Sequence, residues 1–357
     1  MPGHELYMER CLQLAVIGAG NVAPNPMVGA VLVHNHRIIG EGYHEHYGKA
    51  HAEVNCIQSV KSEDKHLIPE SVIYVSLEPC AHQGKTPPCA DLIIASKIPE
   101  VVIGCRDPFP LVNGKGIEKL MSAGIKVTNG ICEEQCKTIN KRFFIFHNNH
   151  RPYIILKWAQ SCNGIIGSPL ERIFITNEYT NRVVHKWRSQ ETALMVGTNT
   201  ALKDDPALTT RLWPGKNPVR IVVDLNLTLP PYLQLFDNTV STIVFNTIRN
   251  TIEDFNTDLN NSCKVWYYQV TNDVSIVQQV LHALYQLKIQ SVIIEGGAKL
   301  IQSFIAENAW DEARVITNEQ LYLPQGLKAP ETGAARLTYS ETILSDRIDY
   351  YSNVSIL

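Results

Sequence analysis

The sequence predicts an α/β protein with two domains, residues 1–147 and residues 148–357. The chain's 357 residues exceed the roughly 250–300 at which a single hydrophobic core stops growing. In both halves, short apolar runs typical of strands alternate with helical patterns, which is the order expected of layered α/β domains. Between the halves, the polar stretch 146–152 (FHNNHRP) has the composition of an interdomain linker.

Strand and helix patterns follow one another from the start of the first half. Apolar residues at three- and four-residue spacing predict a helix over 5–17, which Gly18 and Gly20 end. The later elements are shorter, and a polar turn joins the first two strands. Their predicted ranges are strands 28–34 and 37–43, a helix over 51–60, strand 72–77, a helix over 89–96 and strand 101–105.

The second half repeats this alternation beyond the polar stretch. Its clearest element is an amphipathic helix over 273–288, which we expect to pack on the core through one apolar face. That face carries Val277, Val280, Leu281, Leu284 and Leu287. The other predicted ranges are strands 153–158, 193–197, 220–224, 242–246 and 291–295, and helices over 177–188 and 299–307.

Charge and cysteine content narrow the class of protein. Thirty-two basic against 35 acidic residues give a net charge of −3, which argues against a sequence-independent nucleic-acid binder. The first twenty residues lack the apolar core of a signal peptide, and no stretch approaches the roughly 20 apolar residues of a membrane span. The nine cysteines have no repeating spacing, as is usual for free thiols in a reducing compartment. We therefore expect a soluble, cytoplasmic protein.

Three metal-ligand side chains and one carboxylate form a recognisable pattern. His51 and Glu53 begin a predicted helix, Cys80 follows a buried strand within Glu78-Pro79-Cys80, and Cys89 comes nine residues later. Zn²⁺ held by three protein ligands keeps one position for water and lowers its pKa to about 7. When the metal-bound water attacks a ring carbon that carries an amine, protons must move as well. A carboxylate that does not bind the metal can move them, and Glu53 is placed for this role. His-x-Glu followed by Pro-Cys and a second Cys is the signature of zinc nucleobase deaminases.

Two alternatives compete with a catalytic zinc site. A closed structural site would need a fourth ligand, for which His82 is the obvious nearby candidate. Such sites commonly use close cysteine pairs, whereas eight residues separate Cys80 from Cys89. The other alternative, chance placement with no metal, is disfavoured because the two motifs occur together.

The segment 79–89 (PCAHQGKTPPC) resembles the bifunctional riboflavin-biosynthesis deaminase-reductase (RibD/RibG) family. So do 24–29 (PNPMVG), 40–44 (GEGYH) and 106–108 (RDP), and the resemblance covers nearly the whole chain. It implies a cytidine-deaminase-like three-layer α/β/α domain followed by a dihydrofolate-reductase-like α/β domain, with Zn²⁺ and NADPH as cofactors. The implied reactions are hydrolytic deamination of 2,5-diamino-6-ribosylamino-4(3H)-pyrimidinone 5′-phosphate and reduction of the product's ribosyl group to ribityl.

The resemblance also implies a substrate site in the first half. The residues that it places against the deaminase substrate are Asn25, His44, His82, Lys85 and Asp107. Lys85 is a compact cation near the metal ligands and suits a phosphate. The chain departs from the family at Phe109, where an asparagine is often found, so that asparagine's side-chain hydrogen bond is missing.

In the second half, the resemblance rests on 156–161 (LKWAQS), 196–200 (VGTNT), 204–211 (DDPALTTR) and 294–297 (IEGG). The implied cofactor-binding residues are Ala159, Phe174, Thr200, Asp204 and Gly297. The implied substrate-binding residues are Arg172, Arg188, Leu208, Arg211 and Glu295. Independently, glycines before a helix N-terminus let a phosphate approach backbone N–H groups. Asn163, Arg172 and Phe174 stand where the family often has aspartate, serine and tryptophan.

We weigh three functions. The leading one is the bifunctional enzyme, which we expect to take a small-molecule substrate and to form a dimer or tetramer through its reductase domains. The second is a nucleic-acid deaminase of the tRNA type with a non-catalytic second domain, which the net acidity and the wide cysteine spacing disfavour. The third is a regulatory protein whose reductase-like half only senses a nucleotide.

Overall fold

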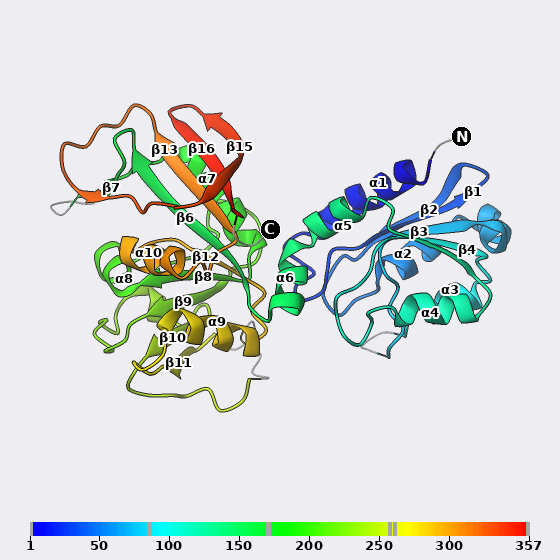
Figure 1. The fold of residues 1–357 in the computed structure, drawn as a ribbon, viewed down its shortest axis with the longest axis horizontal. Coiled ribbons are helices and arrows are strands. Elements are labelled where there is room, and N and C mark those ends of the chain that lie inside the picture. Colours follow the sequence, from blue (N-terminus) through cyan, green and yellow to red (C-terminus); the bar gives the residue numbers. More distant parts are fainter. Residues whose placement is uncertain (1–2, 84–86, 169–172, 256–258, 260–262, 355–357) are drawn as a thin grey trace. The chain divides into compact units, whose positions relative to one another are not determined.

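The computed structural model describes residues 3–83, 87–168, 173–255, 259 and 263–354. The chain divides into two compact units, Met1–Asn149 and His150–Leu357 (Figure 1). No helix among the described residues is long and apolar enough to cross a membrane.

Unit 1 is built on a five-stranded sheet of order β2-β1-β3-β4-β5. β1 runs antiparallel to β2 and β3, whereas β3, β4 and β5 are parallel. The carboxyl ends of β3 and β4 therefore lie side by side. The strands are β1 Gly29–His34, β2 Arg37–Tyr43, β3 Val72–Leu77, β4 Glu100–Cys105 and β5 Lys126–Asn129.

Helices cover both faces of this sheet (Figure 1). α1 (His4–Ala15) and α5 (Glu133–Ile139) pack on one face, against side chains such as Val31. α2 (Ala52–Gln58), α3 (Cys89–Ala95) and α4 (Lys115–Ser122) pack on the other, against Leu32 and its neighbours. Because successive strand residues point to opposite faces, Val31 and Leu32 serve different cores. Unit 1 is thus the three-layer α/β/α sandwich that the sequence predicts.

The polar stretch at 146–152 is only partly a linker. α6 spans Lys141–Asn149 and buries Phe143 and Phe146 within unit 1. These two phenylalanines are three residues apart and so share one helix face. The linker prediction is wrong for 146–149, because those polar residues belong to the end of an amphipathic helix. Two 3₁₀ helices, η1 (Val16–Gly18) and η2 (Ser62–Glu70), complete unit 1.

Unit 2 contains a nine-stranded sheet of order β11-β10-β9-β8-β12-β6-β13-β16-β15. The strands from β11 to β13 are parallel, and β16 and β15 extend the sheet in antiparallel fashion. Its strands are β6 Tyr153–Ser161, β8 Ala193–Gly197, β9 Val219–Val223, β10 Thr242–Asn246, β11 Val265–Gln269, β12 Ser291–Ile294, β13 Glu312–Asn318, β15 Ala335–Ile343 and β16 Asp346–Asn353. β7 (Ile165–Gly167) pairs with β14 (Leu327–Lys328) in a separate ribbon.

The helices of unit 2 follow from local sequence signals. α7 (Glu178–Gln190) begins after Asn177, whose side chain accepts hydrogen bonds from two first-turn N–H groups. α9 (Ile276–Gln286) buries the apolar face expected of it, and each fully buried aliphatic side chain there contributes about 1.5–3 kcal/mol. The remaining helices are α8 Thr198–Asp204, η3 Gln234–Phe236 and α10 Ala298–Ala306. α8 directly follows β8, and α10 follows β12 after a short turn.

Candidate active sites

His51, Cys80 and Cys89 bring three potential metal ligands together near the carboxyl end of β3. His51 directly precedes α2, and Cys89 is the first residue of α3, whose start follows two prolines. Nδ1 of His51 lies 3.6 Å from Sγ of Cys80 and 3.3 Å from Sγ of Cys89. Tetrahedral zinc, with Zn–N near 2.05 Å and Zn–S near 2.3 Å, requires an N–S separation of roughly 3.5 Å. The residues present therefore fit zinc.

The ligand set has three members within the part of the chain that the structure describes. The three ligand atoms lie within 4.8 Å of one another, and His82 is not in the group. The backbone N–H of Cys89 donates to Sγ of Cys80 over 3.3 Å. Hydrogen bonding from Cys89 outweighs burial and, with His51, lowers the pKa of Cys80 to about 4. A thiolate at this position is the form that binds a metal.

Glu53 lies in the first turn of α2, beside the ligands. Its side chain is buried, at 3% exposure, and its carboxyl group interacts with the thiol of Cys89. Burial, followed by the charge of Cys80, raises the pKa of Glu53 to about 7. A carboxyl group with that pKa can both accept and release a proton near neutral pH.

Asn25 and His44 form a hydrogen-bonded pair next to this centre. Nδ1 of the buried His44 lies 3.0 Å from the carbonyl oxygen of Ala50, which can only accept, so Nδ1 carries the proton. Nε2 of His44 then accepts from Nδ2 of Asn25 over 3.1 Å. Burial lowers the pKa of His44, which favours this neutral form, and its ring packs edge-on against His51 at 5.3 Å. The orientation of the Asn25 amide is thus fixed.

Asp107 follows β4 and is buried, at 6% exposure. Its Oδ1 accepts from the backbone N–H of Phe109 over 2.7 Å. Burial, together with the charges of Glu78 and Cys80, raises the pKa of Asp107 to about 7. The ring of Phe109 lies 6.0 Å from that of His82, whose buried Nδ1 makes no hydrogen bond to the described residues. An aromatic contact therefore stands where the family often has an asparagine. Lys85 lies outside the described residues.

In unit 2, the turn after β12 meets the N-terminus of α8. Gly296 and Gly297 both have positive φ, 154° and 78°, and a Cβ on Gly296 would lie 2.9 Å from Cγ2 of Thr200. The turn therefore accommodates little beyond glycine here. Gly297 is the N-cap of α10, and a Cβ there would lie 3.6 Å from Oγ1 of Thr200, so Thr200 stands beside the positive end of that helix dipole. Asp204 ends α8, and Ala159 lies in β6.

Arg188, in the last turn of α7, pairs with Glu295, which directly follows β12. Nε of Arg188 donates to Oε1 of Glu295 over 2.8 Å, and Nη2 donates to Oε2 over 2.5 Å. Burial opposes ionisation of Glu295, but the charges of Arg188 and Lys157 outweigh it and lower its pKa to about 2. Two nitrogens of the Arg188 guanidinium thus donate to a carboxylate. The third, Nη1, donates to the carbonyl oxygen of Thr209 over 3.2 Å.

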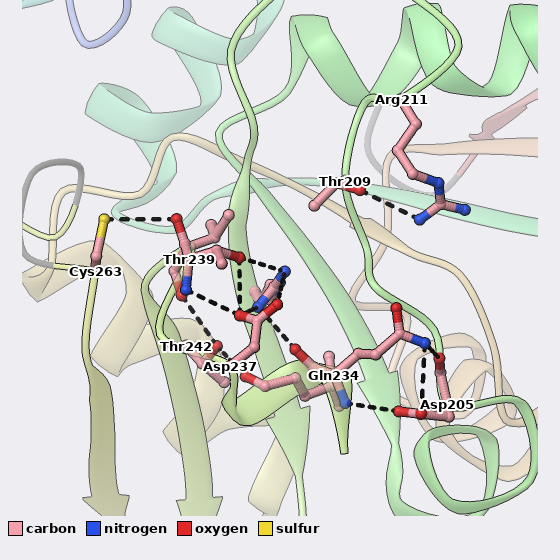
Figure 2. Close-up of polar contacts among 11 residues, drawn as sticks. Asp205, Thr209, Arg211, Gln234, Asp237, Thr239, Thr242 and Cys263 are labelled. Atoms are coloured by element: carbon pink, nitrogen blue, oxygen red, sulfur yellow. Dashed lines mark hydrogen bonds and ion pairs between the residues drawn. The ribbon is translucent and has the colours of Figure 1, made fainter. Parts of the chain in front are cut away.

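Two of the remaining reductase candidates, Leu208 and Arg211, lie in the segment after α8. Leu208 is buried, whereas Arg211 is exposed and donates to Oγ1 of Thr209 over 3.2 Å; Figure 2 shows its guanidinium turned toward that residue. The turn is held by Gln234, whose backbone and side-chain nitrogens donate to Asp205 over 2.8 and 2.7 Å (Figure 2). Phe174 is 78% exposed. Arg172 lies outside the described residues.

Two further titratable side chains at this site were not identified from the sequence. Lys157 projects from the middle of β6 close to Glu295 and Arg188, and burial lowers its pKa. His185 lies in α7, and burial, together with Arg188, lowers its pKa to about 4. A lysine inside an otherwise apolar strand was the available signal for the first. His185 carries no comparable signal, because a single histidine within a helix is common.

Comparisons with known proteins agree with both units. Residues 1–105 match the cytidine and deoxycytidylate deaminase zinc-binding region, and residues 152–318 match the RibD C-terminal domain. The riboflavin biosynthesis protein RibD of Aquifex aeolicus (strain VF5) is 37% identical over 346 residues, which cover 96% of this chain and 94% of that protein. RibD of Bacillus amyloliquefaciens is 38% identical over 311 residues, which cover 86% of this chain and 82% of that protein.

Two solved structures resemble the whole chain. One is a diaminohydroxyphosphoribosylaminopyrimidine deaminase/5-amino-6-(5-phosphoribosylamino)uracil reductase from Thermotoga maritima, with a TM-score of 0.85, 33% identity and 98% of both chains covered. The other is Acinetobacter baumannii RibD, form 1, with a TM-score of 0.86, 30% identity and the same coverage.

The fold and the sites define a zinc-dependent deaminase joined to a reductase. The chain belongs to the RibD family of riboflavin biosynthesis, and it is a bifunctional enzyme that uses zinc for deamination and NADPH for reduction. The predicted fold class and the leading functional prediction are confirmed. The tRNA-type deaminase and the non-catalytic regulator receive no support, since the relatives are small-molecule enzymes.

Proposed function

We propose that the deaminase domain acts on 2,5-diamino-6-ribosylamino-4(3H)-pyrimidinone 5′-phosphate, and that the reductase domain converts its product to 5-amino-6-(5-phosphoribitylamino)uracil. The main support is the three-ligand centre of His51, Cys80 and Cys89 with the buried carboxyl group of Glu53 beside it. The name of the Thermotoga maritima protein describes the same pair of activities. Zinc, when bound, supplies an activated water for attack on the amine-bearing ring carbon.

The residues around the zinc centre orient the substrate and move protons. Glu53 moves two protons of the attacking water in turn: its carboxylate passes the first to the ring nitrogen, and the second, from the new hydroxyl group, to the amine that leaves as ammonia. Asn25, held through its nitrogen by His44, and the buried Asp107 position the pyrimidine and ribose. His82 and Lys85 reach toward the ribose phosphate or its neighbours. The unpartnered Nδ1 of His82 agrees with a ligand at this position.

In the reductase domain, NADPH supplies the hydride for reduction of the ring-opened ribosyl group. Thr200 and Gly297 receive the cofactor phosphates at the start of α10, and Ala159, Phe174 and Asp204 complete the cofactor site. The domain must hold the nicotinamide carbon roughly 3–3.5 Å from the sugar carbon and exclude water.

The substrate side of the reductase contains Arg172, Arg188, Leu208, Arg211 and Glu295. Arg211 is the phosphate ligand among the described arginines, because it is exposed and bound only weakly to Thr209, at 3.2 Å. Arg188 instead holds the carboxylate of Glu295 in a fixed orientation through two short hydrogen bonds. The resemblance places both arginines at the substrate, and in this division of roles only Arg211 contacts the phosphate.

The remaining proposals concern the enzyme as a whole. The deaminase domain spans 1–147 and the reductase domain 148–357. The nine cysteines, none of which forms a disulfide among the described residues, suit action in the reducing cytoplasm. The chain forms a dimer or tetramer through its reductase domains. β15 supports this, since it is a nine-residue edge strand that exposes Leu337 and Tyr339. Analytical ultracentrifugation tests it, and a monomer at micromolar concentration would contradict it.

Mass spectrometry of one reaction mixture tests the proposed chemistry. With zinc, the diaminopyrimidinone phosphate and NADPH, the substrate mass should rise by about 1 on deamination and then by about 2 on reduction, because NH becomes O and two hydrogens are added. Oligonucleotides that contain cytidine or adenosine serve as alternative substrates. Deamination of an oligonucleotide, with no change in the pyrimidine phosphate, would refute the proposal.

A further inference from the structure

Glu78 is a buried carboxylate that the chemistry above leaves without a role. It follows β3, precedes the zinc ligand Cys80 by two residues and is 4% exposed. Its Oε1 accepts from the backbone N–H groups of Gly116 over 2.9 Å and Ile117 over 3.3 Å. Its Oε2 accepts from Gly114 over 2.9 Å and Asp107 over 3.3 Å. One side chain thus binds four N–H groups of a single segment, residues 107–117, which ends in the first turn of α4 and is termed here the Asp107 loop.

The Asp107 loop packs directly on the backbone that leads to Cys80. A Cβ on Gly116 would lie 2.0 Å from the carbonyl oxygen of Pro79, so this position requires glycine. Gly114 adopts a left-handed φ of 84°, which lets the loop turn back toward Glu78. The loop therefore lies against the backbone next to the zinc ligand Cys80.

The same loop carries Phe109 and also Asp107, which the proposed function places against the substrate. Asp107 is held at both its ends, because its N–H binds Glu78 and its Oδ1 accepts from Phe109. Phe109 in turn contacts the rings of His82 and His147, at 6.0 and 5.1 Å. A displacement of the loop would therefore move Asp107 and Phe109 together.

We propose that Glu78 is a positioning residue of the deaminase, which holds the Asp107 loop in the conformation that binds the ribosyl part of the substrate. Only an ionised carboxyl group presents acceptors alone on both oxygens, and hydrogen bonds to it are stronger than those to a neutral group. An amide of the same shape would turn one acceptor into a donor that faces two N–H groups. The inference deepens the proposed deaminase function and rests on it.

Glu78→Gln in the full-length zinc-loaded enzyme tests this role, and Glu41→Gln is the matched control. Glu41 also loses charge-assisted hydrogen bonds in that variant, to Arg10, but at a partly exposed site away from the loop. Zinc content, amide hydrogen exchange, kcat and KM are measured for each protein. Exchange is compared between peptides that cover the Asp107 loop and peptides that cover α2.

For Glu78→Gln we expect one zinc per chain, loop amides that exchange at least about tenfold faster, and a KM raised about tenfold or more with kcat within about threefold. Glu41→Gln should match the wild type in zinc content, hydrogen exchange, kcat and KM. Gly116→Ala should reproduce the KM effect, because it displaces the same loop from the other side. The Gly116→Ala variant introduces no glutamine side chain, so it shows whether the KM effect comes from displacement of the loop.

If Glu78→Gln had the same hydrogen exchange in the Asp107 loop and the same KM as the wild type, the inference would be overturned. Loss of zinc together with kcat would also overturn it, because Glu78 would then support the metal and not the loop. A wild-type enzyme that does not deaminate the pyrimidine phosphate would refute the proposed function instead. Hydrogen exchange would still decide whether Glu78 holds the loop.

Discussion

Replacement of Glu295 by glutamine should destabilise unit 2 by about 3 kcal/mol at pH 7. The carboxylate and Arg188 form a bidentate pair whose side chains are 5% and 13% exposed. The pKa of Glu295 falls from 4.5 to about 2 in the folded protein. This fall in pKa, from 4.5 to about 2, corresponds to roughly 3 kcal/mol, because each tenfold change in the acid dissociation constant is worth about 1.36 kcal/mol. Loss of one partner from a buried pair generally costs a similar amount, because the other charge stays buried.

The pH dependence follows from the direction of the shift. Because folding lowers the pKa of Glu295, its stabilising contribution is complete above the unfolded value of 4.5. The contribution is lost as the pH falls from 4.5 towards 2. The difference in unfolding free energy between wild type and Glu295→Gln should therefore shrink from about 3 kcal/mol at pH 7 towards zero near pH 2.

Tryptophan fluorescence in a urea titration measures this difference for unit 2 alone. Every tryptophan of the chain lies in unit 2, so unfolding of unit 1 or loss of zinc contributes little signal. The residues are Trp158, Trp187, Trp213, Trp266 and Trp310.

Glu319→Gln provides the control for this measurement. Glu319 also pairs with an arginine in unit 2, Arg347, but the two side chains are 47% and 45% exposed. That variant should lose less than about 1 kcal/mol. The reasoning fails if Glu295→Gln loses no more than Glu319→Gln at pH 7, or if its deficit persists undiminished at pH 3.

Three predictions concern activity. Glu53→Gln should retain zinc but deaminate at no more than a few per cent of the wild-type rate, as measured by ammonia release; greater activity would rule out the assigned proton shuttle. Arg211→Ala should raise the KM of the reduction about tenfold or more, through loss of a charged hydrogen bond to phosphate, and leave deamination unchanged. If both steps fell together, the separation of the two sites would be wrong. Removal of zinc by a chelator should abolish ammonia release, while NADPH oxidation continues when deaminated substrate is supplied; loss of both would contradict separate cofactor use.

The sequence predicts the buried strands best. The buried strands β3, β8 and β10 have the predicted bounds, as does the partly exposed edge strand β2, and most other predicted elements differ by a few residues at their ends. Buried strands are short apolar runs between polar residues, so the chain itself marks where they begin and end. The antiparallel pair β15 and β16 was not predicted. β15 is mostly exposed, and its order comes from backbone hydrogen bonds to β16, which no side-chain periodicity records.

The predicted metal ligands converge because each lies at a strand or helix end. Cys80 follows β3, and His51 and Cys89 stand at the N-termini of α2 and α3. The hydrogen-bond partners within the site were not predictable. The pairing of Arg188 with Glu295 joins residues 107 positions apart, and the four bonds to Glu78 come from a loop up to 39 positions away. Only the tertiary fold brings such partners together.

Both units place their polar site residues beyond the carboxyl ends of neighbouring parallel strands. Glu78 and Asp107 follow β3 and β4, and in unit 2 Thr200 and Glu295 follow β8 and β12. Parallel strands end at the same edge, so residues that are distant in sequence converge there whatever the intervening helices. Residues just after a strand are therefore visible to sequence analysis as candidates. Lys157 was missed because it lies inside β6 and reaches the site only through the pairing of that strand with β12.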